Sequence, residues 1–204
     1  MASRYRGYTG RLLQVDLGTG RVSEYLVSDE DRERFLGGRF LSTRILWDVL
    51  PPGVDPMSPE NVLVVMTAPL TGTGGPCTSR FDISAKSPLT GAIGHSNSGG
   101  NFGIYLKRCG LDGLLVRGRA SKPVYLLVEE SGVQIRDASG LWGMDTERTQ
   151  HELMELHGKG GTIVIGPAGE NLVKYAAIVS QERLHGRTGM GAVMGSKNLK
   201  GMVA

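Results

Sequence analysis

The 204-residue chain has few cysteines, few aromatic residues and no long hydrophobic run. Its two cysteines, Cys77 and Cys109, form no CxxC pair, so the sequence contains neither a disulfide framework nor a zinc-finger spacing. No apolar run reaches the roughly 18 residues of a membrane span, and the first residues lack the apolar core of a signal peptide. We therefore expect a cytoplasmic protein in a reducing compartment, without a membrane partner.

Common nucleotide and metal motifs are missing or incomplete. The segment Gly189–Gly195 matches a dinucleotide fingerprint, but only nine residues follow it, too few to reach the acidic residue of a Rossmann unit. The chain has no GxxxxGK[ST] phosphate loop and no HExxH metal pair. Its net charge of +3 is too small to indicate a nucleic-acid partner.

Glycine, in contrast, is abundant: 31 of 204 residues, roughly twice its usual share. Because glycine costs backbone entropy on folding, the excess indicates many turns or close approaches to a ligand. The glycines punctuate apolar runs rather than forming a tract, which argues against low-complexity disorder. The shares of hydrophobic residues (40%) and charged residues (21%) are those of an ordinary globular protein.

Two glycine-rich segments, 79–100 and 181–191, carry arginines and only one acidic residue each. Glycine lets the main chain approach a ligand closely, and arginine offers a planar fork of donors. Together they predict a ligand with two anionic, phosphate-like groups. The alternative interpretation is a solvated basic face of the protein.

The hydrophobic patterns predict one α+β domain over residues 1–204. Strands are expected at 11–17, 21–27, 61–67, 81–85, 111–117, 123–129, 133–136, 162–166 and 199–204, and helices at 28–35, 40–50, 102–109, 145–157 and 192–198; residues 175–180 lead into the second glycine segment. The order of strand pair, helix, buried strand and glycine segment occurs about twice, which suggests an internal duplication. The apolar terminal strand, which has no polar tail, predicts a domain of a longer polypeptide.

No residue stands out as a catalytic acid, base or nucleophile. His95 and His185 lie beside the glycine segments and are candidate ligand contacts. We expect Cys77 to be a buried structural cysteine rather than a reactive thiol. A chain with anion-binding segments and no catalytic residue fits a role in holding a cofactor.

Six phrases, in order and spacing, resemble the N-terminal domain of the tungsten-containing aldehyde:ferredoxin oxidoreductases. They are PLTGT at Pro69–Thr73, KSPLTG at Lys86–Gly91, SNSGG at Ser96–Gly100, DASGLWG at Asp137–Gly143, GPAGEN at Gly166–Asn171 and GAVMGSKNLK at Gly191–Lys200. The resemblance implies two β-sheets with flanking helices, which form a base for a bis-pterin tungsten (or molybdenum) cofactor. It also implies that dithiolene sulfurs hold the metal and that Mg²⁺ bridges the two pterin phosphates.

The same resemblance assigns cofactor contacts position by position. They are Arg80, Asn97, Gly99, Arg183, Leu184 and Gly186, with the main-chain carbonyls of Asn97 and Leu184 on Mg²⁺. Leu184, His185 and Thr188 depart from the small residues expected in this family. A main-chain ligand tolerates a different side chain, so the departure at Leu184 leaves its implied role intact.

In the complete enzyme, the resemblance implies oxidation of an aldehyde to a carboxylic acid. Electrons would leave for ferredoxin through a [4Fe–4S] cluster held by later domains, which this chain lacks. The isolated chain should therefore be inactive, and an exposed apolar face should make it self-associate, giving a homo-oligomer. The alternative is a non-catalytic module that binds a pterin or another phosphate-bearing ligand.

Overall fold

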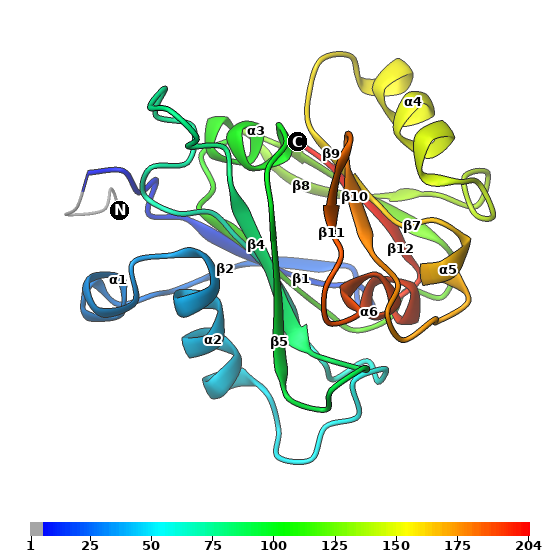
Figure 1. The fold of residues 1–204 in the computed structure, drawn as a ribbon, viewed down its shortest axis with the longest axis horizontal. Helices are drawn as coiled ribbons and strands as arrows, with labels where there is room; N and C mark the ends of the chain where they lie inside the picture. The colour runs from blue at the N-terminus through cyan, green and yellow to red at the C-terminus, as the bar shows by residue number, and fades with distance from the viewer. Residues whose placement is uncertain (1–5) are drawn as a thin grey trace.

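The computed structural model describes residues 6–204, which form two six-stranded mixed sheets with flanking helices (Figure 1). Sheet A has the order β2-β1-β6-β3-β4-β5 and contains β1 (Leu12–Asp16), β2 (Arg21–Tyr25), β3 (Leu63–Met66), β4 (Phe81–Lys86), β5 (Ile93–Ser98) and β6 (Gly113–Arg117). Sheet B has the order β11-β10-β9-β12-β7-β8 and contains β7 (Val124–Glu129), β8 (Gly132–Asp137), β9 (Thr162–Val164), β10 (Ile178–Ser180), β11 (Arg183–His185) and β12 (Leu199–Val203).

The two sheets repeat one topology. Each begins with an antiparallel hairpin, β1–β2 or β7–β8, whose first strand pairs in parallel with the last strand of its sheet, β6 or β12. Three antiparallel strands complete each sheet, β3-β4-β5 in sheet A and β9-β10-β11 in sheet B. The repeated order noticed in the sequence is therefore a repeat of the fold.

Within residues 6–204, six helices connect and cover the sheets. They are α1 (Asp29–Phe35), α2 (Gly38–Val49), α3 (Phe102–Arg108), α4 (Thr146–His157), α5 (Pro167–Glu170) and α6 (Met190–Ser196). The first turns of α1 and α4 are capped by Ser28, whose Oγ accepts from the Asp31 N–H at 3.0 Å, and by Asp145, which accepts from the Arg148 N–H at 2.8 Å. None of the helices in the described chain is long and apolar enough to cross a membrane.

The core has three parts. The main cluster joins the inner faces of the two sheets, with Val65 and Ile83 from sheet A packed in one group with Ile163 and Met202 from sheet B. Two smaller clusters lie on the outer faces. One is formed where α2 packs on sheet A, and the other where α4 packs on sheet B. Each sheet is thus covered by apolar packing on both of its faces, so a functional site is expected at the sheet edges.

The glycine-rich segment Gly189–Gly195 is not a dinucleotide loop. Gly189 caps the buried helix α6, and the rest of the segment lies within that helix. All seven residues of α6 are buried, and the helix contacts both sheets. A Cβ on Gly195 would come within 1.9 Å of the Gly169 carbonyl oxygen, and one on Gly191 within 2.4 Å of the Ala177 oxygen. These glycines therefore serve the close packing of α6.

Three elements differ from the sequence-based expectation. Strands β5 and β11 lie in segments predicted as glycine loops, and the short helix α5 was not predicted. Serine, asparagine and glycine have low strand propensity, but six cross-strand pairs with β4 hold β5 extended. The two segments are therefore edge strands with glycine-rich ends.

Candidate functional site

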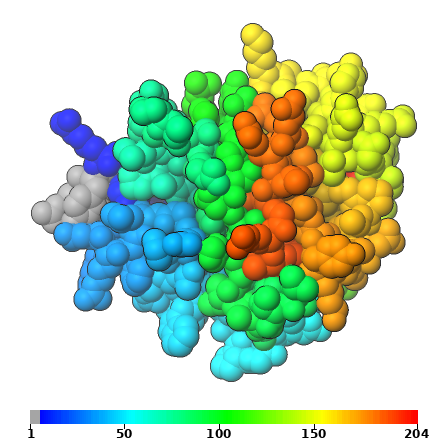
Figure 2. Space-filling view, viewed as in Figure 1, coloured from blue at the N-terminus to red at the C-terminus, as the bar shows by residue number. Residues whose placement is uncertain are grey.

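The two sheets meet where their edge strands β5 and β11 lie side by side, near the centre of the face in Figure 1. We call this contact the seam. The His185 Nδ1–H donates to the Ser96 carbonyl at 2.8 Å, and the Arg187 N–H donates to the Ser96 hydroxyl at 3.2 Å. Residue numbers rise along one strand as they fall along the other, so Asn97 and Leu184 each adjoin a residue of the Ser96–His185 contact. Figure 2 shows the green and orange atoms of these segments meeting in the middle of the face.

A cavity of about 410 Å³ lies at one end of the seam. Residues from both sheets line it: Cys77, Ser79, Arg80, Gly99, Gly100, Asn101, Gln181 and Arg183. Three of the six residues expected at the site, Arg80, Gly99 and Arg183, are in this lining. Asn97, Leu184 and Gly186 lie outside the lining, along the seam.

The cavity has cationic walls that the protein does not neutralise. Arg80 and Arg183 are exposed, and neither forms an ion pair with a described residue. The Arg80 side chain is oriented by its Nε–H, which donates to Asn97 Oδ1, while Asn97 Nδ2 donates to the Phe81 carbonyl at 3.0 Å. An oriented guanidinium without a carboxylate partner suits an incoming oxyanion.

Gly100 allows the two segments to approach one another beside this cavity. Its φ is +105°, and a Cβ there would lie 2.7 Å from the Ser180 hydroxyl. The N–H of the next residue, Asn101, donates to Gln181 Oε1 at 3.1 Å. The cradle therefore depends on a glycine at this position, as the glycine-rich composition suggested.

The candidate histidines separate into one buried and one accessible residue. His185 is fully buried against the Phe81 ring, and burial lowers its pKa to about 4, so it is neutral. The side chain of His95 is 44% exposed, with its Nδ1 4.0 Å from the buried Asp82 carboxylate. The expectation for Cys77 is wrong: it is exposed, has a φ of +60°, and lines the cavity.

Five lining residues were not selected from the sequence: Cys77 as a site residue, Ser79, Gly100, Asn101 and Gln181. Ser79 and Gly100 lie within the first glycine segment, and Gln181 begins the second. Their neutral side chains gave no chemical signal, although their sequence position beside the arginines did.

In the described part of the chain, no group of three or more His, Cys, Asp or Glu side chains could hold a metal ion. A metal bound here would need main-chain or ligand oxygens.

Comparison with known proteins gives consistent matches. A family model described as the N-terminal domain of aldehyde ferredoxin oxidoreductase matches residues 12–204. The tungsten-containing aldehyde ferredoxin oxidoreductase of Pyrococcus furiosus is 45% identical over 197 residues, covering 95% of this chain and 33% of that protein. An aliphatic sulfonate oxidoreductase, WOR-like subunit, of the same organism is 40% identical over 217 residues, covering 97% of this chain and 34% of that protein.

A solved structure also matches closely. The active-site complex BamBC of benzoyl coenzyme A reductase, in complex with 1,5-dienoyl-CoA, superposes with a TM-score of 0.95 at 37% identity. The match covers 98% of this chain and 31% of that chain. The present chain thus spans about a third of the length of the relatives that it matches.

Proposed function

Since this chain belongs to the aldehyde ferredoxin oxidoreductase family, as its N-terminal domain, we propose that residues 1–204 form the base for a bis-pterin tungsten or molybdenum cofactor. The observation that carries the proposal is the pair Arg80 and Arg183. Arg80 directly precedes β4 of sheet A, and Arg183 lies on β11 of sheet B; both line one cavity and have no carboxylate partner among the described residues. Such a site is complementary to a ligand with phosphate groups.

Each proposed contact has a distinct chemical task. Arg80 and Arg183 donate hydrogen bonds to the anionic groups of the cofactor. Gly99 and Gly186 let the main chain approach it. The carbonyls of Asn97 and Leu184 would supply oxygen ligands to Mg²⁺, an ion that prefers oxygen donors. The oxygen chemistry of this donor set fits Mg²⁺, and it does not require a carboxylate.

In the complete protein, the bound cofactor would supply the oxidation of an aldehyde and water to a carboxylic acid, with release of two electrons and two protons. The residues of this chain bind and orient the cofactor and exclude water from beneath it. We assign electron transfer, through a [4Fe–4S] cluster to ferredoxin, to the part of the protein beyond this domain. The substrate is also determined there, because relatives of this domain carry names that specify quite different substrates.

Metal and pterin content test the proposal. The chain, purified from cells grown with tungstate, is compared with Arg80→Gln, Arg183→Gln and the double variant. Each guanidinium contributes charge-assisted hydrogen bonds of about 1.5–3 kcal/mol, so each single variant should bind the cofactor roughly 10–100-fold more weakly. Tungsten by mass spectrometry and pterin by fluorescence after oxidation are the readouts.

Arg136→Gln is the matched control, since Arg136 is an exposed arginine on edge strand β8 of sheet B. Equal tungsten and pterin content in all the variants would refute the proposal. Loss of a phosphate-bearing pterin from the double variant, with no metal in any sample, would instead favour the non-catalytic binding module.

A further inference from the structure

The turn that brings Arg183 to the cavity is a strained one. Gln181 and Glu182 form the two-residue connection between β10 and β11, whose residues Ser180 and Arg183 are paired. Gln181 has a φ of +55°, in the left-handed region that glycine adopts more readily than any other residue. Such a conformation persists only where the surrounding structure stabilises it, so contacts from outside the hairpin are expected at Gln181.

Gln150, on helix α4, supplies those contacts with a single side-chain amide. Its Oε1 accepts from the Gln181 N–H at 2.6 Å, and its Nε2 donates to the Gln181 carbonyl at 3.3 Å. Oε1 also accepts from the hydroxyl of Thr162, a buried residue of β9, at 3.0 Å. Because a main-chain N–H can only donate, its bond determines which end of the amide carries the oxygen. Gln150 therefore binds both main-chain polar groups of Gln181 and links them to sheet B.

The side chain of Gln181 continues this network to the opposite rim of the cavity. Its Oε1 accepts from the Asn101 N–H at 3.1 Å. A Cβ on Gly161, just before β9, would lie 2.4 Å from the Phe102 Cα, so the chain around Asn101 packs tightly against sheet B. Hydrogen bonds thus run from Gln150 through Gln181 to Asn101, and they join α4 to a segment that lines the cavity.

Gln181 also separates two cavities. It lines the cavity of Arg80 and Arg183, and it lines a second cavity of about 600 Å³ between α4 and the edge of sheet B. Gln150 belongs to the lining of the second cavity and not to that of the first. Gln150 can therefore affect a ligand of the first cavity only through the residue that the two cavities share.

We propose that Gln150 is a positioning residue for the cavity of Arg80 and Arg183. It fixes the turn that carries Arg183, and it directs Gln181 Oε1 toward the Asn101 N–H, so the two rims of the cavity keep one spacing. A ligand with two anionic groups requires such a spacing, because each group must meet its own donors. The inference rests on the proposed function in so far as that cavity binds an anion.

Amide hydrogen exchange of the chain, followed by NMR, tests the network directly. Gln150→Leu keeps the approximate size of the side chain and removes its three hydrogen bonds. We expect the N–H groups of Gln181 and Asn101 to exchange roughly tenfold faster, although the Asn101 N–H is bonded to Gln181 and not to Gln150. The Arg148 N–H, in the first turn of α4, should stay as slow as in the native chain. Thr162→Val is the matched control, because it removes one bond of Gln150 and leaves both bonds to Gln181.

Calorimetric titration with inorganic pyrophosphate at low ionic strength measures the consequence for binding. Gln150→Leu should weaken binding about 3–10-fold, the equivalent of one neutral hydrogen bond. Gln181→Leu should have a similar effect, and the double variant should bind hardly more weakly than either single variant, because residues of one network are not additive. Gln134→Leu, the same substitution at an exposed glutamine of β8, should bind as the native chain does.

The outcomes separate this inference from the proposed function. Native-like exchange of the Asn101 N–H in a folded Gln150→Leu chain would overturn the inference, and so would unchanged pyrophosphate affinity where Arg80→Gln/Arg183→Gln loses it. If Arg80→Gln/Arg183→Gln binds pyrophosphate like the native chain, the anion site is refuted, and exchange alone decides the role of Gln150.

A second variant covers the case in which Gln150→Leu does not fold. Gln150→Glu loses only the bond to the Gln181 carbonyl and keeps an acceptor for the Gln181 N–H. It is judged by exchange, because its new charge would itself act on an anion. Faster exchange of the Asn101 N–H supports the positioning role, and native-like exchange there overturns it.

Discussion

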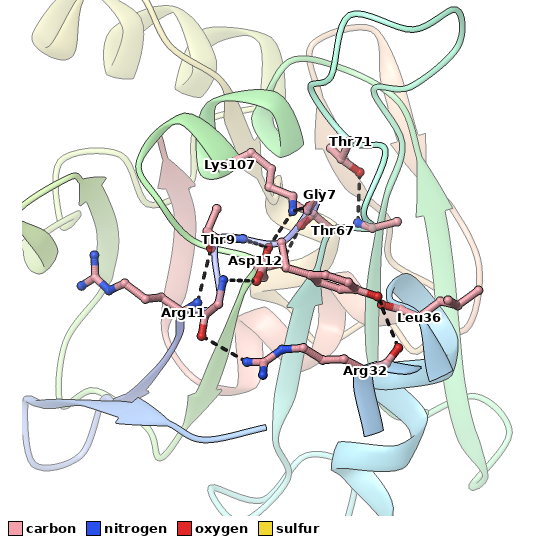
Figure 3. A network of polar contacts seen from close by, with 12 residues as sticks. Gly7, Thr9, Arg11, Arg32, Leu36, Thr67, Thr71, Lys107 and Asp112 are labelled. Carbon is pink, nitrogen blue, oxygen red and sulfur yellow. Dashed lines mark hydrogen bonds and ion pairs between the residues drawn. The ribbon is translucent and has the colours of Figure 1, made fainter. Parts of the chain in front are cut away.

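The cations around Asp112 and those around the cavity are the same kinds of side chain in opposite surroundings. Figure 3 shows the Asp112 network, in which the carboxylate accepts from the Thr9 N–H at 3.0 Å, the Gly10 N–H at 2.8 Å and Lys107 Nζ at 2.6 Å. Lys107 Nζ also donates to the Gly7 carbonyl. The Lys107 and Asp112 charges are thus paired with each other and with main-chain groups, and the result is a clasp that fixes residues 7–10 to the body of the domain.

Arg80 and Arg183, in contrast, have exposed guanidiniums and no carboxylate within ion-pair distance in the described chain. The fold pairs the buried Lys107 with Asp112 but leaves two arginines unpaired beside a cavity, where an anionic ligand can reach them. The difference between the two regions lies in compensation and location, not in the kind of charge. Substitutions in the Asp112 network should therefore change the stability of the fold, whereas substitutions at the cavity should change the affinity for an anion.

The largest expected effect is on the clasp. Asp112→Ala leaves the Lys107 ammonium, whose side chain is 9% exposed, without its counter-charge, and leaves two backbone N–H groups unpaired. Removing one partner of a buried pair costs about 3–5 kcal/mol of unfolding free energy. Urea denaturation measures this loss, while calorimetry with pyrophosphate should show unchanged affinity. A stability loss no larger than in Asp137→Ala, which removes an exposed partner of Lys122, would contradict the comparison.

A smaller effect is expected from Lys197, a buried cation compensated by carbonyl oxygens alone. Its Nζ donates to the carbonyls of Asn61, Pro59 and Gly118. Burial and the positive charges of Arg119 and Arg117 lower its pKa to about 7. The unfolded chain, with an ordinary lysine pKa near 10.4, then binds more protons than the folded chain above pH 7, so stability rises as pH increases from about 7 toward 10.

The slope in that window approaches about 1.4 kcal/mol per pH unit, or about 2–3 kcal/mol between pH 7 and pH 9. Lys197→Met should abolish it. The measurement is the denaturation midpoint at both pH values for the native chain and the variant. The upper limit of pH 9 avoids the tyrosines with raised pKa values, Tyr8, Tyr25 and Tyr125, which act in the opposite direction near pH 10. An equal slope in both proteins would assign the pH dependence to other groups.

The regular part of this fold could be predicted from the sequence. Alternation predicted β1 and β2, a continuous apolar run predicted β3, and Ser28 and either Asp145 or Thr146 marked helix starts because their side chains can cap backbone N–H groups. Strands β5 and β11 were missed. Their extended form comes from pairing with β4 and β10, and local composition does not carry that information.

The site could be predicted only in part. The glycine-rich segments with arginines indicated a site for anionic groups, and the family resemblance assigned Arg80 and Arg183, which do line one cavity. The roles of Asn97, Leu184 and Gly186 remain predictions. Sequence reasoning misjudged Cys77, because its exposure depends on the path of the loop that precedes β4. It also gave no means of separating Arg119, which is held by carbonyls, from Arg187, which is not.

The backbone of the cavity offers a third, more modest test. Gly100→Ala adds a Cβ at a φ of +105° and 2.7 Å from the Ser180 hydroxyl, so it combines backbone strain with a steric clash. We expect a loss of about 2 kcal/mol in stability and weaker pyrophosphate binding, because the cavity wall must shift. Gly91→Ala is the matched control: its φ is +72°, but nothing lies within 4 Å of the added Cβ. It should lose about 1 kcal/mol, from strain alone, and keep its affinity. Equal losses of pyrophosphate affinity in Gly100→Ala and Gly91→Ala would show that the steric clash with Ser180 does not determine binding.

The smallest effect is expected where a charge pair is satisfied yet exposed. Arg34 and Glu30 form an i,i+4 pair on α1 at 3.2 Å, with side chains 70% and 72% exposed. Water screens such a pair, and ordering two long side chains costs entropy, so Arg34→Gln should change the unfolding free energy by less than about 0.5 kcal/mol. Urea denaturation at low and high salt measures it. A change as large as that of Asp112→Ala would mean that exposure does not decide the strength of these pairs. Compensation would then no longer separate the structural cations from the functional ones.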